Sequence, residues 1–339
     1  MNKRFIPMAI LILASAGLSQ EIAAPKMGGY FSFDYSQGQE DGLFKNSRLG
    51  GLDAGLVLTG QLSDTFSYTF EARFRSESRI EIEQAWLALR LSKSLNFILG
   101  DFLVPFGRYN RANRPHETFL VQRPLVFEKA YPASWRDLGL QVSGKLSFIL
   151  FAAFIGNGLA EAESPDKGQQ FGDNNSDKAW GGRLSVQPDQ TLDIGLSYYQ
   201  GKYDDAGTRK LKMLGVDAAW VTVDYSLSAE YIKTDSANPA PWAKGVTEGF
   251  FVQLAIKYKD FSPVVSYQKA KQDDPFHGLG WSSPLEPGAG LADTRTRWAL
   301  GLIYLPVSNI HLKAEYDFNR EIGPALKDDL ISVQATVNF

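Results

Sequence analysis

The chain has 339 residues, a formal net charge of −3 at pH 7 and no cysteine, and 13% of its residues are aromatic. The lack of cysteine excludes a disulfide framework. Without a basic run, nothing in the charge pattern points to nucleic acid as a partner. The abundance of Phe, Tyr and Gly suits strands and turns, so the composition favours an all-β protein.

The first twenty residues have the layout of a secretory signal peptide. Lys3 and Arg4 precede an apolar stretch from Phe5 to Ala16, and small residues follow. The stretch is too short to cross a membrane as a helix. We expect a signal peptide at 1–20, cleaved near Ser19 or Gln20, and a single domain at 21–339. A buried N-terminal helix is the alternative.

Residues alternate between apolar and polar along nearly the whole remaining chain. The pattern is clear at 52–59, 66–75, 192–199 and 310–318, where one face is apolar and the other carries charges. Burying such a charged face in a soluble β-sandwich, the alternative fold, would be costly. About sixteen such segments, each of roughly ten residues, match the strands of a transmembrane antiparallel β-barrel. The last of them, 330–339, ends on Phe339 and should pair with 28–35 to close the barrel.

The connections alternate in length, as they do between the two rims of such barrels. The short ones are expected at 60–64, 92–94, 144–147, 187–190, 222–224, 259–262 and 306–309, and the long or variable ones include 36–46, 103–136, 156–177, 234–245 and 272–293. Both termini then lie on the short-turn side. Trp180, Trp220, Tyr258, Trp298 and Tyr304 fall near strand ends, where interfacial aromatic girdles are expected.

The connection at 103–136 is the third on the long side, and its composition is unusual. It holds five arginines and Lys129 against Glu117 and Glu128, with four prolines and six aromatic residues. Proline and aromatic residues favour an ordered loop. We expect a third extracellular loop that folds inward and narrows the lumen, where a few guanidinium groups can enrich anions. The alternative is a solvated loop whose arginines pair with local acids or lipid head groups.

Several motifs in this region resemble a known family in the same order. They are Gln84-Ala85-Trp86-Leu87, the stretch 99–108 with Pro105-Phe106-Gly107-Arg108, Arg123-Pro124, Arg136-Asp137-Leu138-Gly139 and Asn157-Gly158. Together they are similar to landmarks of the phosphate-selective porin O/P family. The resemblance implies a sixteen-stranded outer-membrane channel, a homotrimer, with an inward-folding third loop. It also implies that the terminal Phe339 acts as a signal to the barrel assembly machinery, with outer-membrane lipids around the barrel.

The candidate site residues form two groups. At the constriction we expect anion-binding arginines, namely Arg108, Arg111, Arg114, Arg123 and Arg136, with Arg136 held by Asp137 or Glu128. The strands are expected to add the pore-lining residues Arg73, Arg75, Arg90, Arg183, Arg295, Arg297 and Lys313. The same inward faces carry the acids Glu71, Glu81, Glu83, Asp193, Asp217, Glu230, Glu315 and Asp317. Because this wall is nearly balanced, we expect weak selectivity rather than phosphate specificity.

The sequence therefore predicts an outer-membrane porin for passive diffusion of small polar or anionic solutes, with a mild anion preference. A barrel that serves as an adhesin or structural anchor through its long loops is the alternative. The three histidines, His116, His277 and His311, are scattered, so we expect no enzyme. Residues 173–177 begin like a calcium loop but lack its glycine and distal Glu, and no metal or cofactor is expected.

Overall fold

The computed structural model describes residues 24–42, 44–75, 79–162, 165–238, 245–272, 294–321 and 326–339. The signal peptide predicted at 1–20, His277 and most of the connection predicted at 272–293 lie outside the described residues. Among the described residues, no helix has the length and hydropathy needed to cross a membrane.

Sixteen strands make up most of the described chain, with one short α-helix. The strands are β1 (Lys26–Gly38), β2 (Arg48–Gln61), β3 (Phe66–Arg75), β4 (Arg79–Ser92), β5 (Leu95–Leu103), β6 (Arg136–Leu146), β7 (Ile149–Gly156), β8 (Ala179–Val186), β9 (Leu192–Lys202), β10 (Lys210–Val221), β11 (Tyr225–Ser236), β12 (Gly245–Ile256), β13 (Phe261–Gln272), β14 (Thr294–Val307), β15 (Ile310–Glu321) and β16 (Leu330–Asn338). The helices are α1 (Leu125–Ala130) and two 3-10 turns, η1 (Tyr109–Arg111) and η2 (Pro165–Lys167).

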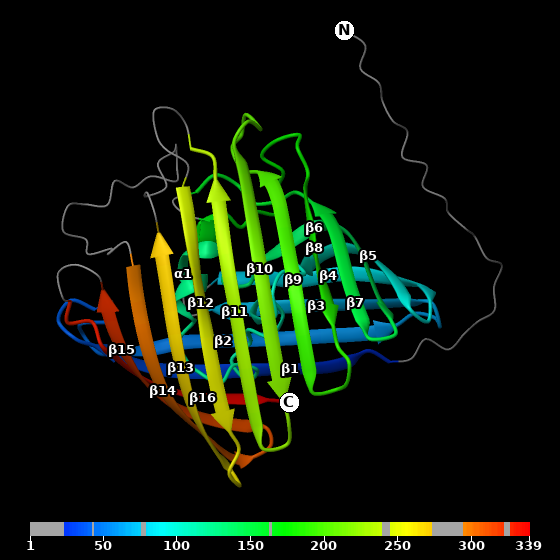
Figure 1. Ribbon diagram of the computed structural model, residues 1–339. Coiled ribbons are helices and arrows are strands. Elements are labelled where there is room, and N and C mark those ends of the chain that lie inside the picture. Colours follow the sequence, from blue (N-terminus) through cyan, green and yellow to red (C-terminus); the bar gives the residue numbers. More distant parts are fainter. Residues whose placement is uncertain are drawn as a thin grey trace, which may run out of the picture.

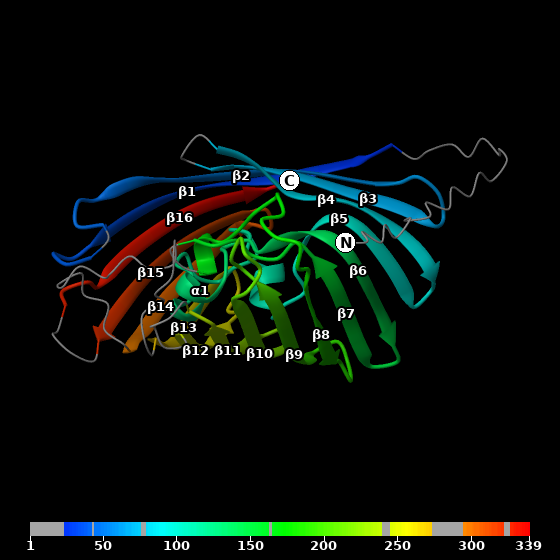
Figure 2. The ribbon, with the colours of Figure 1, turned by 90° about the horizontal axis from the view of Figure 1, so that it is seen from above.

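Each strand pairs antiparallel with its neighbours in sequence, and β1 pairs with β16 to close the barrel. Figures 1 and 2 show the resulting ring of strands. At the seam, Tyr30 lies opposite Asn338 and Ser36 opposite Ser332. Closure pairs the backbone N–H and C=O groups that would otherwise be free along the edges of β1 and β16. The predicted antiparallel barrel of sixteen strands and the pairing of the last strand with the first are confirmed.

Short links join the strands at the rim where the chain ends; in Figure 1 those of the green to orange strands are at the bottom and those of the blue and cyan strands are at the right. Only residues 93–94, 222–224 and 308–309 separate the strands at three of these turns. The link between β6 and β7 lies at 147–148, a few residues later than the alternation predicts, with Ser147 at a φ of 54°. We call this rim the short-turn rim.

The two faces of the wall differ as the alternation predicts. Outward side chains are apolar and exposed, as at Phe33 (51% exposed), Leu99 (53%) and Leu184 (53%), whereas inward Asp217 and Ser332 are buried. The five predicted girdle aromatics are all exposed. Trp180 and Trp298 lie near the long-connection ends of their strands; Trp220, Tyr258 and Tyr304 lie near the short turns.

Residues 104–135, which we call the inner segment, join β5 to β6 and run across the inside of the ring in Figure 2. Phe106, Phe127, Tyr131 and Trp135 are fully buried in one cluster. The wall side of this cluster comes from inward-facing apolar residues of β9–β12, namely Tyr199, Leu211, Met213, Ile232 and Phe251. The barrel therefore has a packed interior on that side, and α1 rests against β12 and β13.

Candidate functional site

Carboxylates of the wall hold the backbone of the inner segment. Glu230 of β11 accepts hydrogen bonds from the backbone N–H groups of Arg108 (3.1 Å) and Tyr109 (3.0 Å). Glu315 of β15 accepts from those of Val121 (2.5 Å) and Gln122 (2.9 Å). Each of these acid side chains thus accepts from two successive backbone N–H groups of the segment. These anchors and the aromatic cluster fix where the arginines of the segment lie.

Gly107 sits at the first anchor, with a φ of 62°. A Cβ atom at this position would collide with the carboxylate of Glu230. Its backbone N–H donates to the hydroxyl of Ser197 (3.0 Å). Only glycine combines this left-handed backbone with such a close approach, which explains the Pro-Phe-Gly turn after β5.

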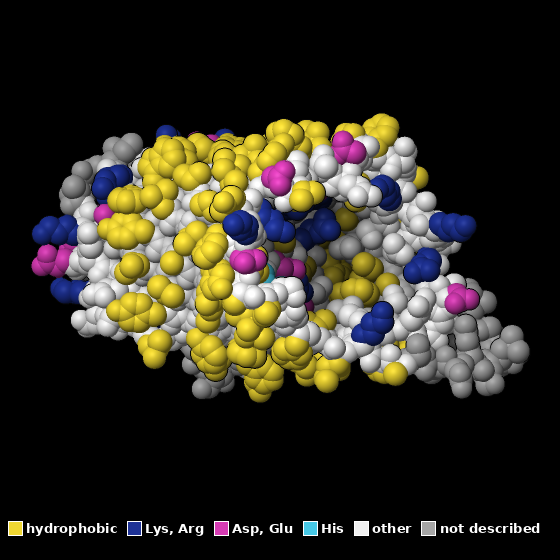
Figure 3. Space-filling view, turned by 90° about the horizontal axis from the view of Figure 1, so that it is seen from below, with side chains coloured by type: hydrophobic (Ala, Val, Ile, Leu, Met, Phe, Trp, Pro, Cys, Tyr) yellow, Lys and Arg dark blue, Asp and Glu magenta, His cyan; other side chains and the backbone are white. Residues whose placement is uncertain are grey.

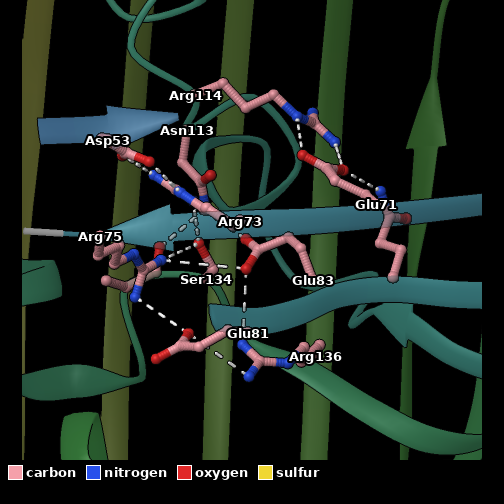
Figure 4. Close-up of polar contacts among 12 residues, drawn as sticks. Asp53, Glu71, Arg73, Arg75, Glu81, Glu83, Asn113, Arg114, Ser134 and Arg136 are labelled. Carbon is pink, nitrogen blue, oxygen red and sulfur yellow. Dashed lines mark hydrogen bonds and ion pairs between the residues drawn. The ribbon is translucent and has the colours of Figure 1, made fainter. Parts of the chain in front are cut away.

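Arg73 of β3 is the centre of the network drawn in Figure 4. Its guanidinium donates to both oxygens of Asp53 (2.7 and 2.5 Å), to Glu83 (3.1 Å) and to the hydroxyl of Ser134 in the inner segment (2.7 Å). Arg75 extends the network to Glu81 (3.3 Å) and also donates to Ser134 (3.2 Å). Both predicted pore-lining arginines are therefore neutralised by neighbouring acids.

Arg114 of the inner segment joins the same wall through Glu71 of β3. Its Nε and Nη2 atoms donate to the two carboxylate oxygens (2.9 and 2.5 Å), and its Nη1 atom lies 3.3 Å from Glu117. Desolvation opposes the charge of this guanidinium, but the bonds and charge of Glu71 outweigh it and raise the pKa of Arg114.

Arg136 corrects one prediction. It pairs with Glu81 and Glu83 (3.6 Å each) and with Asp101 (3.7 Å), not with Asp137 or Glu128. Asp137 instead accepts the backbone N–H groups of residues 157 and 158, and Glu128 pairs with Arg297. Strand register sets Arg136 opposite Leu103 of β5, and its guanidinium reaches Asp101 of β5 and, across that strand, the acids of β4.

The other three predicted constriction arginines differ in their surroundings. Arg108 is exposed and lies 3.5 Å from Asp193. Arg123 folds back on its own segment and donates to the carbonyls of Tyr131 and Pro132 (3.0 Å each). Arg111 is exposed and makes no ion pair with any residue that the structure describes. Of the five, Arg111 and Arg123 have no acidic partner among the described residues, and of these two only Arg111 is exposed.

Most of the remaining predicted pore-lining cations are also paired. Arg183 is bound by Asp217 and Asp193, Arg297 by Glu128 and Asp317, and Arg295 by Glu321 and Asp328. Lys313 is buried and donates to the carbonyl of Pro115 (2.5 Å) and the hydroxyl of Thr118 (3.0 Å). Arg90 is exposed near the short-turn rim. The wall is thus balanced, as the sequence indicates.

A cavity of about 500 Å³ lies between the inner segment and β4–β8, and we call it the basic cavity. Its cationic lining consists of Lys93, Arg111, Arg114, Lys145 and Arg183, and no Asp or Glu is among the described residues that line it. Because residues 93 and 145 lie at short turns, the cavity opens toward the short-turn rim. Figure 3, which views this rim, shows a hollow with Lys and Arg side chains, and also some Asp and Glu, at its border.

A second cavity, of about 270 Å³, meets the inner segment at other residues. It is lined by Arg73, Arg75 and Arg123 together with Asp34 and Asp53, so its charges nearly cancel. The inner segment supplies Arg111 and Arg114 to the basic cavity but Asn113 and Arg123 to this one. The two cavities therefore flank one narrow stretch of the chain.

Lys93 and Lys145 are site residues that sequence reasoning missed, because both fall in stretches assigned to short turns. Continuing the inward series Gln141 and Ser143 by two residues would have placed Lys145 on the inward face. Among the described residues, no group of three or more potential metal ligands occurs.

Comparisons with known proteins agree with this fold. The chain resembles a loop-deletion form of the outer membrane protein OmpT of Vibrio cholerae (TM-score 0.67, 11% identity, 93% of this chain and 99% of that one). It also resembles OmpF of Salmonella typhi (0.67, 13%, 93% and 97%) and an anion-selective porin from Comamonas acidovorans (0.67, 12%, 93% and 98%). At these identities the likeness concerns the fold alone.

Sequence comparison adds the family. An uncharacterised protein of Aquifex aeolicus is 26% identical over 157 residues, which cover 40% of this chain and only 36% of that relative. The model of the phosphate-selective porin O and P family matches residues 52–218, from β2 to β10, the part that holds the inner segment and the basic cavity. With a closed barrel of sixteen strands around that part, the chain belongs to the phosphate-selective porin O and P family, whose place is the bacterial outer membrane.

Proposed function

We propose that this porin lets small hydrophilic solutes diffuse passively across the outer membrane, with a mild preference for anions. The basic cavity carries the proposal, because five cationic side chains line it and no carboxylate is among its described lining residues. In a confined space with low-dielectric walls, such charges raise the local concentration of anions and lower that of cations.

Three of the five cations are free to act on a solute. Arg111, Lys93 and Lys145 form no ion pair with any described residue, and Lys145 only approaches the side-chain oxygen of Gln187 (3.5 Å). Arg114 and Arg183 also face the cavity, but their charges are offset by Glu71 and Asp217. The excess of positive charge is therefore small, which supports mild anion selectivity rather than a dedicated phosphate site.

The narrowest part of the path is proposed to lie at the inner segment, within 103–136. Its aromatic cluster packs against β9–β12, and its backbone is anchored to Glu230 of β11 and Glu315 of β15, so the segment occupies the β9–β15 side of the barrel. Solutes then pass along the β1–β8 side, where the two cavities lie. Arg111 is the cation at this passage that can meet them unpaired.

Planar bilayers test the proposal directly. Purified protein should give discrete conductance steps and, in a KCl gradient, a reversal potential displaced toward that of chloride. Arg111→Gln should lower the anion-to-cation permeability ratio by roughly twofold or more, as expected for one unit charge acting across water. Lys327→Gln, which removes a 73% exposed charge outside both cavities, is the matched control.

Two results would contradict the proposal. Folded protein without conductance steps would favour a plugged barrel that serves as an anchor or adhesin. An unchanged reversal potential in Arg111→Gln would show that Arg111 does not act on ions in the passage.

We further propose that the mature domain, 21–339, forms a homotrimer after loss of the signal peptide at 1–20. A solved relative, OmpT of Vibrio cholerae, is described in a trimer form (TM-score 0.63). The apolar outer face supports outer-membrane lipids as partners. Phe339, exposed at the barrel seam, supports recognition by the barrel assembly machinery.

A further inference from the structure

Apolar side chains also line part of the basic cavity. Trp86 of β4, Ile98 of β5 and Leu150 and Ala152 of β7 all border it. Each is only partly buried, and Trp86 donates its indole N–H to the side-chain oxygen of Gln84 (3.2 Å). The hollow in Figure 3 accordingly has hydrophobic as well as cationic side chains at its border.

This apolar wall differs from the other apolar inward residues of the barrel. Met213 (1% exposed) and Ile232 (0%) are inward-facing too, but the inner segment covers them. Trp86 and Ile98 touch the edge of the aromatic cluster but stay only partly buried, and together with Leu150 they border open volume. Apolar surface left in contact with water forgoes roughly 25 cal/mol per Å² that burial would supply, and exposed apolar patches mark binding sites more often than chance.

We propose that the basic cavity transiently binds organic anions with an apolar body as they pass through the porin. Aromatic monocarboxylates are the typical members of this class. The inference rests on the proposed diffusion function and adds the class of solute. The carboxylate meets Arg111 on the inner segment, and the ring lies against Trp86, Ile98 and Leu150. A cavity of about 500 Å³ is within the range that binds small organic molecules.

The same arrangement favours such anions over inorganic ones. Phosphate is attracted by the charge of Arg111 but has no apolar surface to remove from water. To bind phosphate well, the cavity would need several arginines that are not already paired. Here Arg114 and Arg183 already bind Glu71 and Asp217. An aromatic ring, in contrast, can stack on an indole face or lie beside aliphatic side chains without a further charge.

Benzoate and acetate are suitable probes, because they share one charge and differ in the apolar body. The measurement is single-channel recording of full-length protein in KCl. Benzoate should reduce the chloride current at a concentration roughly tenfold below that needed for acetate or phosphate. Burial of part of one aromatic ring is sufficient for a tenfold difference in affinity. Trp86→Ala should remove most of the difference between benzoate and acetate. Trp298→Ala, at an outward-facing position, should leave it intact.

The outcomes separate this inference from the function on which it rests. If the protein conducts with its normal anion preference but benzoate and acetate have equal effects, the proposed class of solute is wrong and the porin function stands. A difference that survives in Trp86→Ala also overturns it. Absence of conductance overturns both. Arg111→Gln should weaken the effects of both carboxylates equally, since it removes the shared charge and not the apolar wall.

Discussion

Arg114 of the inner segment and Glu71 of β3 form a two-pronged ion pair inside the barrel, with N–O distances of 2.9 and 2.5 Å. Glu71 is fully buried and also accepts a hydrogen bond from the amide of Gln84 (3.0 Å). The pair ties the segment to the wall and, at the same time, cancels a cation at the edge of the basic cavity. Structure and selectivity therefore depend on the same contact.

The first prediction follows from this double role. Glu71→Gln keeps the shape and a hydrogen-bond acceptor but frees the charge of Arg114, so the anion-to-cation permeability ratio should rise by roughly twofold to fivefold. Reversal potentials in a KCl gradient measure it. The double variant Glu71→Gln with Arg114→Gln should return close to the native ratio, and a lasting rise in the double variant would contradict the assignment.

A second prediction concerns the aromatic cluster that supports the inner segment. Trp135 is fully buried, with its ring 4.8 Å from Tyr199, 5.4 Å from Tyr131 and 5.5 Å from Phe106. Trp135→Ala should weaken the docking of the segment by about 3–5 kcal/mol. Larger and noisier single-channel conductance is expected, with faster proteolysis of the segment. Outward-facing Trp180→Ala is the control, and native conductance in Trp135→Ala would show that the cluster does not hold the passage.

The barrel could be predicted from the sequence because strand alternation and turn length are local signals. Ion pairs between the inner segment and the wall, such as Arg114 with Glu71, could not, since their partners lie far apart along the chain. At β4 the register against β3 shifts between Glu71 and Ala72, and this irregularity interrupts a simple count of alternate positions. The part of the wall that the inner segment covers could also be predicted from the sequence. Its inward positions Leu211, Met213 and Ile232 are apolar, which is expected only where something packs on the inner face.

A third prediction is the effect of pH on selectivity. His116 lies in the inner segment, its ring 5.1 Å from that of Tyr30. Burial is the main cause that lowers its pKa; Glu117 opposes this, and Arg114 and Lys313 reinforce it. The imidazole is then neutral at pH 7 and gains a charge only below the ordinary histidine value of about 6.5. Its lowered pKa also means that protonation disfavours the folded arrangement.

The permeability ratio should accordingly stay constant from about pH 8 to 6.5 and rise toward anions below that, while most carboxylates remain charged down to about pH 5. His116→Gln should abolish the rise. The same measurement in both proteins, at fixed salt, decides the matter, and a rise of equal size in the variant would assign the titration to another group.

A fourth prediction concerns the closing seam of the barrel. The backbone of Phe339 exchanges two hydrogen bonds with Gly29 (2.9 Å each), while its side chain is 64% exposed. Losing two bonds at a strand end should cost the finished barrel only about 1–3 kcal/mol.

If the exposed ring of Phe339 acts mainly as a signal to the assembly machinery, deletion of Phe339 should strongly reduce the amount of folded protein in cells. Refolding of the same variant into detergent micelles should stay close to native. Heat-dependent mobility on gels reports the folded fraction in both settings, and Phe339→Tyr serves as the matched control. An equal loss in cells and in micelles would mean that Phe339 acts through the stability of the seam.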